Sequence, residues 1–277
     1  MAELITSAAN PVVKRVRLLG DRRHRRRERA FVVRGIQPVW QAMEAGAEIE
    51  TLIVAPGLLR DPAARRVPEW EAAGTPVARL SAELFGRIAD RDGPTGLAAI
   101  VRGQPGELGD LRVGPDSVLV ALHEAGNPGN VGTVVRTADA VGAAGVVLIG
   151  ATADPYDPAS VKASMGAIFS VPVVTVMTAG QFLAWARERG VAVAVTSGSG
   201  PGTFWGARLP RPLAILLGSE GSGLPEDLLA RGDLRLKIPM TGSAESLNLA
   251  VAAGVLLYEA WRQVAMAADQ VTDEVAT

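Results

Sequence analysis

The feature that most constrains the fold is a series of six short strand-like segments in the second half of the chain, nearly all of them continuous apolar runs. They occupy residues 117–122, 145–150, 171–176, 191–196, 213–218 and 234–239. Such runs are typical of strands buried on both faces, as in a parallel sheet covered by helices. Helical patterns separate most of them, at 130–141, 158–167, 180–189, 225–230 and 246–266. The alternation predicts an α/β domain with a parallel sheet.

A second, smaller α/β domain is predicted at the N-terminus. The runs "AFVVRG", "ETLIVAP" and "GLAAIVR" have the composition of strands, and helical patterns lie between them. The segment 104–115 is rich in glycine and proline, which is typical of a linker. We therefore expect one domain over residues 1–103, a linker over 104–115 and a second domain over 116–277.

Positive charge is concentrated near the N-terminus. The first 34 residues hold ten Lys and Arg against three acidic residues, although the whole chain has a net charge of -1. Six of these arginines fall in "RRHRRRER", residues 22–29. A solvated helix face explains this run, and so does a surface that binds a polyanion.

Composition excludes several chemistries. The chain has no cysteine and two histidines, His24 and His123. A cysteine nucleophile is therefore impossible, which rules out methyl transfer to a pyrimidine through a cysteine adduct. A histidine-based zinc site is not expected either, and His123 is assigned no catalytic task. The chain lacks an apolar stretch long enough to span a membrane and begins without a signal peptide, so we expect a cytoplasmic protein.

The segment "HEAGNPGNVGTVVRTADAVGAAG", residues 123–145, follows a predicted strand and opens a predicted helix. Asn130 suits the N-cap position, and Arg136 lies on the polar side of the helix. Turn glycines and an exposed helix arginine would explain the same pattern. The glycine spacing, G-x-x-G-x-x-G, differs from the G-x-G-x-x-G of dinucleotide-binding folds, and no acidic residue ends the next strand. A nucleotide-dependent oxidoreductase is therefore disfavoured.

Two further segments place glycines and polar residues after predicted strands. In "LLGSEGSGLP", residues 216–225, three glycines surround Glu220 and would let a ligand approach the backbone closely. In "IPMTGSAESLNLAVAAGVLLYEAW", residues 238–261, a polar loop leads into a helix with Ser246 and Asn248 in its first turn. A plain turn and ordinary capping residues account for the same patterns.

In this order, "NPGNVGTVVRTADA", "LLGSEGSGL" and "IPMTGSAESLNLAVAAGVLLYE" resemble the three signature motifs of the SpoU/TrmH family of RNA 2'-O-methyltransferases. The segment "VKASMGAIFSVPV" is similar to a further recurrent segment of that family. The N-terminal sequences "ITSAANPVVKRVRLL" and "RRERAFVVRG" resemble its substrate-binding domain. The likeness covers nearly the whole chain, and one departure is Arg34, where family members often have glutamate.

The resemblance implies a SPOUT-type catalytic domain with a deep trefoil knot and S-adenosylmethionine as the cofactor. It implies methylation of a ribose 2'-hydroxyl in RNA, with ribosomal RNA favoured over transfer RNA. A non-catalytic RNA-binding or ribosome assembly factor on the same fold is the other alternative, and a role in antibiotic resistance stays open. The implied cofactor-binding residues are Thr196, Gly198, Leu217, Gly218, Ile238, Met240 and Leu247.

The resemblance also assigns the catalytic position to Arg136, supported by Asn130, Glu220, Ser246 and Asn248. A ribose hydroxyl must lose its proton as it attacks the methyl group, and arginine is ordinarily a poor base. Two roles remain open: the site makes this guanidinium unusually acidic, or Arg136 holds a phosphate and orients the hydroxyl.

The resemblance further implies RNA contacts and a homodimer. In this family the basic run at the N-terminus is interpreted as a phosphate-binding surface. Its implied RNA-binding residues are Lys14, Arg22, Arg23, Arg25, Arg26 and Arg27. The last helix is expected either to pack in the core of its own chain or to form dimer contacts, through Leu256, Leu257, Trp261 and Val264.

Overall fold

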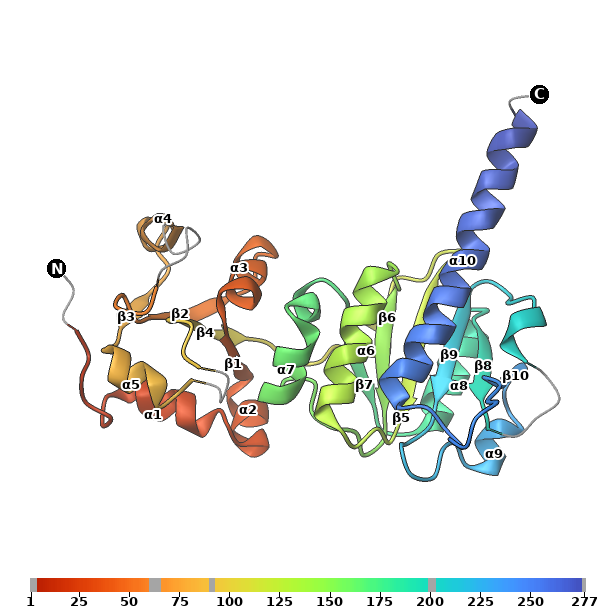
Figure 1. Cartoon of the computed structure of the whole chain (residues 1–277), viewed down its shortest axis with the longest axis horizontal. Helices are drawn as coiled ribbons and strands as arrows, with labels where there is room; N and C mark the ends of the chain where they lie inside the picture. The colour runs from red at the N-terminus through yellow and green to blue at the C-terminus, as the bar shows by residue number, and fades with distance from the viewer. Residues whose placement is uncertain (1–3, 60–65, 90–92, 199–202, 276–277) are drawn as a thin grey trace. The chain divides into compact units, whose positions relative to one another are not determined.

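The computed structural model describes residues 4–59, 66–89, 93–198 and 203–275, with side chains as far as Met266 (Figure 1). The chain forms two compact units. The first comprises residues 1–104 and 154–170, and the second comprises residues 105–153 and 171–277. Within the described ranges, no helix has both the length and the apolar character needed to cross a membrane.

The second unit is built on a six-stranded sheet in which all neighbouring strands are parallel, as predicted. The first three strands, β5, β6 and β7, follow one another toward one edge of the sheet. The next three, β8, β9 and β10, all lie on the other side of β5, so the direction of strand order reverses beside β5. Ligands bind outside the carboxyl ends of the strands at such a reversal. In spatial order the strands are β10 (Leu234–Leu236), β8 (Ala192–Thr196), β9 (Leu213–Leu217), β5 (Val118–His123), β6 (Gly145–Ile149) and β7 (Val173–Val176).

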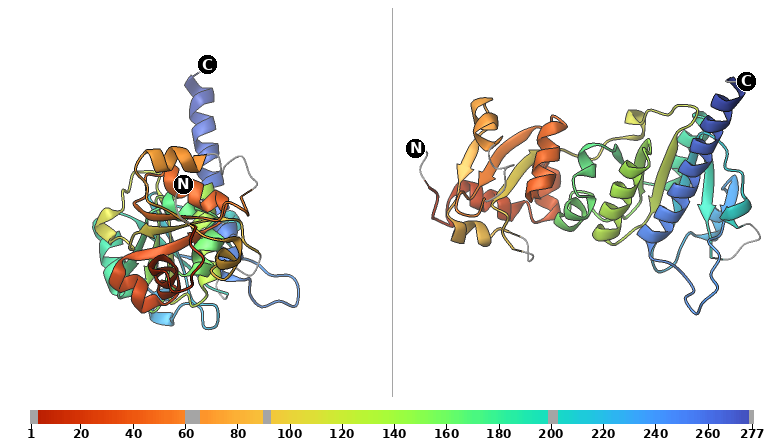
Figure 2. Two further views of the ribbon diagram at one scale, coloured as in Figure 1. Left: turned by 90° about the vertical axis from the view of Figure 1, so that its left-hand side faces the viewer. Right: turned by 45° about the horizontal axis from the view of Figure 1, so that its top comes forward.

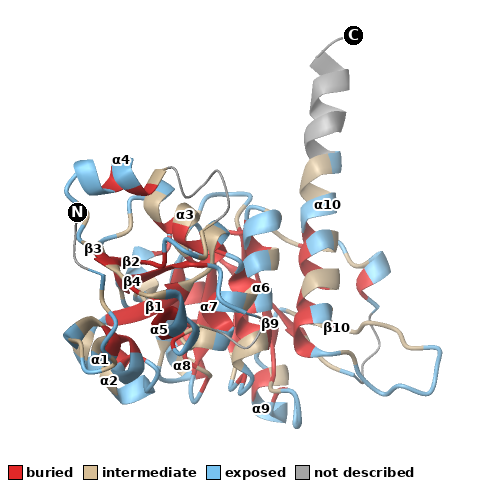
Figure 3. Cartoon of the chain, turned by 60° about the vertical axis from the view of Figure 1, so that its left-hand side comes forward, coloured by how far each residue is buried: buried red, intermediate tan, exposed pale blue. Residues whose placement is uncertain are grey.

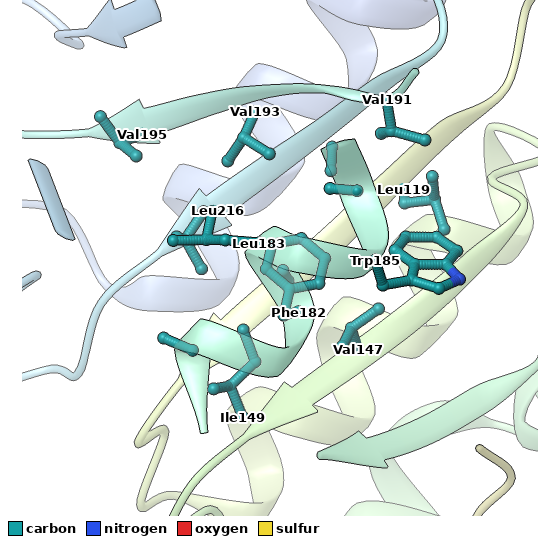
Figure 4. Close-up of a cluster of buried hydrophobic side chains, with 14 of the residues drawn as sticks. Leu119, Val147, Ile149, Phe182, Leu183, Trp185, Val191, Val193, Val195 and Leu216 are labelled. Atoms are coloured by element: carbon teal, nitrogen blue, oxygen red, sulfur yellow. The ribbon is translucent and has the colours of Figure 1, made fainter. Parts of the chain in front are cut away.

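Helices cover both faces of this sheet. On one face, α8 (Ala179–Glu188) and α9 (Glu226–Leu229) enclose a buried cluster in which Phe182 and Trp185 pack over the strands (Figure 4). On the other face, α6 (Pro128–Ala140) and α10 (Leu249–Val275) pack side by side (Figures 1 and 2). Because both faces are covered, the central strands β9, β5 and β6 are buried along nearly their whole length, which is the physical origin of their apolar runs.

The starts of two helices differ from the sequence-based expectation. Asn130, predicted as an N-cap, lies inside α6; the cap is Asn127, whose Oδ1 accepts the N–H of Gly129 at 2.8 Å. Pro128 at the first helical position, where its missing N–H costs nothing, explains the earlier start. Ser246 and Asn248 precede α10 rather than lying in its first turn, and the side chain of Asn248 caps that helix.

Along α10, buried residues alternate with exposed and intermediate ones (Figure 3), and several of the exposed residues are apolar. Leu256 and Leu257 are buried in the core of their own chain, which decides between the two expectations for these residues. Trp261 is 48% exposed, Tyr258 is 50% exposed, and Val264 is half-buried.

The first unit has a mixed sheet in the order β1-β4-β2-β3. Of its two central strands, β4 is antiparallel to both neighbours, β1 and β2, and β2 is parallel to β3. Separate apolar clusters fill the two faces, one under α1 and α5 and the other under α3, α4 and α7. The elements are α1 (Pro11–Leu18), α2 (Arg22–Glu28), β1 (Ala30–Arg34), α3 (Ile36–Glu44), β2 (Ile49–Val54), α4 (Val67–Ala72), β3 (Val77–Arg79), α5 (Ala82–Gly86), β4 (Leu97–Arg102) and α7 (Pro158–Ser164).

Residues 154–170 follow β6 in the sequence but belong to the first unit. The sequence predicts one domain over 116–277, and the structure differs here because aromatic residues of this segment stack against Phe31 of β1. The ring of Phe31 stacks on that of Tyr156 at 4.2 Å and on that of Phe169 at 6.0 Å. Burial, aided by the nearby Asp154 carboxylate, raises the pKa of Tyr156 to about 12.

Candidate active site

A cavity of about 460 Å³ opens at the carboxyl edge of the parallel sheet. The loops that follow three neighbouring strands, β8, β9 and β10, form its walls together with the start of α10. Its volume is in the usual range for small-molecule and cofactor sites. The structure brings all seven residues expected to bind the cofactor to its wall: Thr196, Gly198, Leu217, Gly218, Ile238, Met240 and Leu247.

The loop after β9 is closed tightly over Gly218. A Cβ atom at this position would lie 2.0 Å from the carbonyl carbon of Gly223, so no other residue fits without moving the backbone. The N–H of Gly223 donates to the carbonyl of Ser219 at 3.1 Å, and the hydroxyls of Ser219 and Ser222 are 2.8 Å apart. The loop therefore presents bare backbone to the cavity in a fixed shape.

The cavity combines apolar walls with polar edges. Leu217, Ile238 and Leu247 provide aliphatic surface, while Thr196 and Ser246 provide hydroxyls. An aromatic base can pack against aliphatic walls, and the hydroxyl and backbone groups can bind a sugar or an amino-acid moiety. The residues present thus fit a nucleoside-type cofactor such as S-adenosylmethionine.

A chain of side-chain hydrogen bonds links the three sequence motifs beside this cavity. Asn248 Nδ2 donates to Asn130 Oδ1 at 3.0 Å, and Asn130 Nδ2 donates to Glu220 Oε1 at 2.9 Å. Glu220 and Asn248 lie 28 positions apart in the sequence, and Asn130 is 90 positions from Glu220. Only the fold brings these three candidate residues into contact.

In this hydrogen-bonded network, the chemistry of the two ends determines which group donates and which accepts in each bond. Glu220 as a carboxylate can only accept, so Asn130 must turn its amide nitrogen toward it and its oxygen toward Asn248. At the other end, Asn248 Oδ1 accepts the N–H of Ala250 at 2.9 Å and therefore presents its nitrogen to Asn130. The network orders the Asn130 side chain, which is 9% exposed, in a single orientation.

The Glu220 carboxylate is held in its charged form. Partial burial would raise the pKa of Glu220, but hydrogen bonds from Asn130 and from the backbone N–H groups of Gly126 and Asn127 outweigh burial and lower it. The two backbone bonds measure 3.2 Å and 3.3 Å. A negative charge therefore lies on the cavity wall at neutral pH.

Arg136 and Ser246 lie outside this network. Arg136 is exposed on α6 and does not line the cavity, and within the described residues its guanidinium has no hydrogen-bond or ion-pair partner. Ser246 lines the cavity and is exposed, without a hydrogen bond to any described residue. Both side chains are available to a ligand.

Sequence reasoning missed Asn127, which caps α6 and whose backbone N–H binds Glu220. The dipeptide Asn127-Pro128 was a usable signal, because asparagine followed by proline is typical of a helix start. It also missed Glu245, which lies on the cavity wall.

The structure corrects one residue of the expected RNA-binding set. Arg25 is 4% exposed, and its guanidinium is surrounded by acceptors. Its Nη2 lies 2.8 Å from Asp154 Oδ2, and its Nη1 donates to the carbonyls of Leu19 and Gly20 at 3.0 Å and 2.9 Å. Arg25 therefore cannot contact RNA while the first unit is folded. The other five expected residues are exposed: Lys14, Arg22, Arg23, Arg26 and Arg27.

The parallel sheet and its cavity define an α/β protein that binds a nucleoside-type ligand at the carboxyl edge of its strands. The chain belongs to the SpoU rRNA Methylase family, whose sequence profile matches residues 117–258, just over half of the chain. The profile of the MRM3-like substrate binding domain matches residues 10–99.

Relatives over nearly the full length support this assignment. The chain is 32% identical to the 23S rRNA (uridine(2479)-2'-O)-methyltransferase of Streptomyces viridochromogenes, over 89% of this chain and 87% of that protein. It is 29% identical to the 23S rRNA (guanosine(2553)-2'-O)-methyltransferase RlmP of Bacillus subtilis (strain 168), over 92% of this chain and 97% of that protein.

Solved structures show the same fold. The crystal structure of an AdoMet-bound rRNA methyltransferase from Sinorhizobium meliloti superimposes with a TM-score of 0.86 at 34% sequence identity. The match covers 94% of this chain and 98% of that one.

Proposed function

We propose that this protein transfers the methyl group of S-adenosylmethionine to a ribose 2'-hydroxyl of ribosomal RNA. The observation that carries the proposal is the cavity at the carboxyl edge of the parallel sheet, walled by three signature loops and bordered by the Asn248–Asn130–Glu220 network. Family membership and relatives named as 23S rRNA 2'-O-methyltransferases support the same activity. The names of those two relatives give a uridine and a guanosine as targets, so family membership alone does not identify the target base.

The seven cavity residues expected to bind the cofactor would hold S-adenosylmethionine, which supplies an activated methyl group on a positively charged sulfur. Gly218 lets the loop after β9 close on Gly223 and keep its shape, and the aliphatic residues Leu217, Ile238 and Leu247 would shield the cofactor from water. The ordered amide of Asn130 holds Glu220 and the start of α10 in a fixed relation. Such preorganisation lowers the barrier of a displacement reaction between two bound partners, because their orientation is set before the reaction.

For Arg136 we propose the role of a phosphate clamp that orients the ribose hydroxyl. Its exposure on α6 leaves its planar array of donors free to bind a phosphate through two hydrogen bonds.

For the first unit we propose RNA binding through the exposed residues of α1 and α2. Lys14, Arg22, Arg23, Arg26 and Arg27 project from these two short helices, and phosphate contacts of this kind act independently of sequence. The match to a substrate binding domain over residues 10–99 supports this assignment.

We further propose that the protein is cytoplasmic and that the C-terminal part of its second unit forms the trefoil knot expected from the resemblance.

We also propose that the protein is a homodimer. The exposed residues Val251, Tyr258 and Trp261 on α10 support a dimer contact, because they form an apolar stripe on one side of the helix. Light scattering of the wild type and of Trp261→Glu would test it: a dimer that becomes monomeric supports the contact, and a monomeric wild type refutes it.

The activity is tested by incubating the protein with labelled S-adenosylmethionine and ribosomal RNA that lacks modifications. A ribose-methylated position resists alkaline cleavage, which requires a free 2'-hydroxyl, so the product can be mapped. We expect label at a discrete position in ribosomal RNA and none in a parallel reaction with transfer RNA. No transfer to either RNA would support a non-catalytic binding protein instead.

The role of Arg136 is tested in the same assay with Arg136→Lys, and Arg187→Lys on α8 serves as the exposed control. Lysine keeps the charge but not the planar pair of donors, so we expect turnover to fall by at least tenfold in Arg136→Lys. Near-full turnover would exclude a specific role for the guanidinium.

A further inference from the structure

The lining of the cavity carries negative side-chain charge that no positive side chain of the lining balances. Two carboxylates, Glu220 and Glu245, contribute to its wall, whereas its described lining contains no lysine, arginine or histidine. A pocket with two negative charges and no compensating cation favours positively charged ligands over neutral ones.

The two carboxylates differ in how they are engaged. Glu220 accepts hydrogen bonds from Asn130, Gly126 and Asn127, so its oxygens are directed toward α6. Glu245 lies in the exposed loop between β10 and α10, and it has no hydrogen-bond or ion-pair partner within the described part of the chain. Glu245 therefore supplies a charge to the cavity that no internal interaction uses.

The reaction changes the charge of the ligand at this place. When the methyl group moves to the ribose oxygen, the carbon–sulfur bond breaks, its electron pair stays on sulfur, and the hydroxyl proton is released. The donor S-adenosylmethionine carries a positive sulfur, whereas the product S-adenosylhomocysteine carries a neutral one and otherwise differs by a single methyl group. Van der Waals contacts alone separate two such ligands poorly, since one methyl group contributes only modestly to binding.

We propose that Glu245 is a specificity-determining residue that makes the cavity prefer the positively charged methyl donor over the neutral product. This inference rests on the proposed function and extends it. The preference would weaken product inhibition, because the ligand loses its attraction to Glu245 once the methyl group has been transferred. The distinction depends on charge, so it is independent of the RNA substrate.

Isothermal calorimetry of the full-length protein with each ligand in the absence of RNA tests the inference. In Glu245→Gln we expect the Kd for S-adenosylmethionine to rise roughly three- to tenfold, as for loss of one charge at short range in a partly solvated site. The Kd for S-adenosylhomocysteine should change by less than about twofold on the same grounds. Added salt should reduce the difference between wild type and variant, because it screens exposed charges.

The control is Glu188→Gln at the end of α8, an exposed glutamate outside the cavity, which should leave both Kd values at the wild-type level. The inference is overturned if Glu245→Gln changes both Kd values by the same factor, or changes neither, while the wild type binds the donor. If the wild type binds neither ligand, the proposed function fails as well, and the two failures are thereby distinguished.

Discussion

Removing the guanidinium of Arg25 should destabilise the first unit strongly. Its guanidinium donates four hydrogen bonds, from Nη1 to two carbonyls near the end of α1, from Nε to Asp154 and from Nη2 to Asp157, and Nη2 also lies 2.8 Å from Asp154 Oδ2. The side chains of Arg25 and Asp154 are 4% and 10% exposed, so water cannot replace the lost partner. Asp157, at 34%, remains hydrated and adds little.

The magnitude follows from the charge that is left behind. Arg25→Met has similar length but leaves Asp154 buried without its counter-ion, and breaking a buried pair in this way costs about 3–5 kcal/mol. Replacing both partners, in Arg25→Met/Asp154→Leu, removes the unpaired charge and should recover most of that loss. The exposed neighbour Arg26→Met should stay within about 0.5 kcal/mol of the wild type.

Native-state hydrogen exchange read by mass spectrometry measures this effect within the correct unit. Peptides that cover α2 and α7 report the opening free energy of the first unit, and peptides from the parallel sheet serve as an internal reference. Unchanged protection in Arg25→Met would refute the structural role of this ion pair. A double variant as unstable as the single one would refute the explanation by an unpaired carboxylate.

Three further predictions concern the second unit and the basic surface. Gly218→Ala should weaken S-adenosylmethionine binding at least about tenfold by calorimetry, because its Cβ meets the carbonyl of Gly223. The control Gly206→Ala, outside the cavity and with no described atom within 4 Å of its Cβ, should bind normally. The folded pKa of Glu220 lies below its ordinary 4.5, so its charge stabilises the fold fully above that pH and loses this effect as pH falls through the folded value. The urea midpoints of wild type and Glu220→Gln should therefore converge progressively as pH falls from about 6 to below 4.5, and a constant gap would contradict this role of Glu220. In filter binding, the slope of log affinity against log salt should drop by about 0.7–0.9 for each lost phosphate contact; an unchanged slope would remove the proposed RNA surface. The variant for that measurement has glutamine in place of four arginines: Arg22, Arg23, Arg26 and Arg27.

Much of the second unit could be predicted because its signals are local. Each strand is an apolar run, and Gly142 and Gly190, with φ of 65° and 66°, end α6 and α8 as expected from their positions. The cofactor residues also follow strand ends directly, and parallel topology gathers such ends at one edge of the sheet. Their shared position on one cavity wall is therefore a consequence of strand order.

The role of Arg25 could not be predicted because it depends on a contact between distant residues and not on a local pattern. In the sequence it is one of six arginines in a run of eight, with nothing to separate it from its exposed neighbours. Its partner Asp154 is 129 positions away, in a segment that the apolar pattern assigns to the other unit. Burial of one arginine among many depends on this long-range contact.

The sequence by itself determined the parallel sheet, the order of the elements, the family and the seven residues expected to bind the cofactor. Each of these follows from residue types and their spacing over short stretches of the chain. Tertiary structure alone decided that Glu220, Asn130 and Asn248 form one directed network, that Arg25 is structural, and that residues 154–170 pack in the first unit. The physical reason is that a hydrogen bond or a buried ion pair requires atoms within about 3 Å of each other. Only the packing of the whole chain sets distances between residues far apart in sequence.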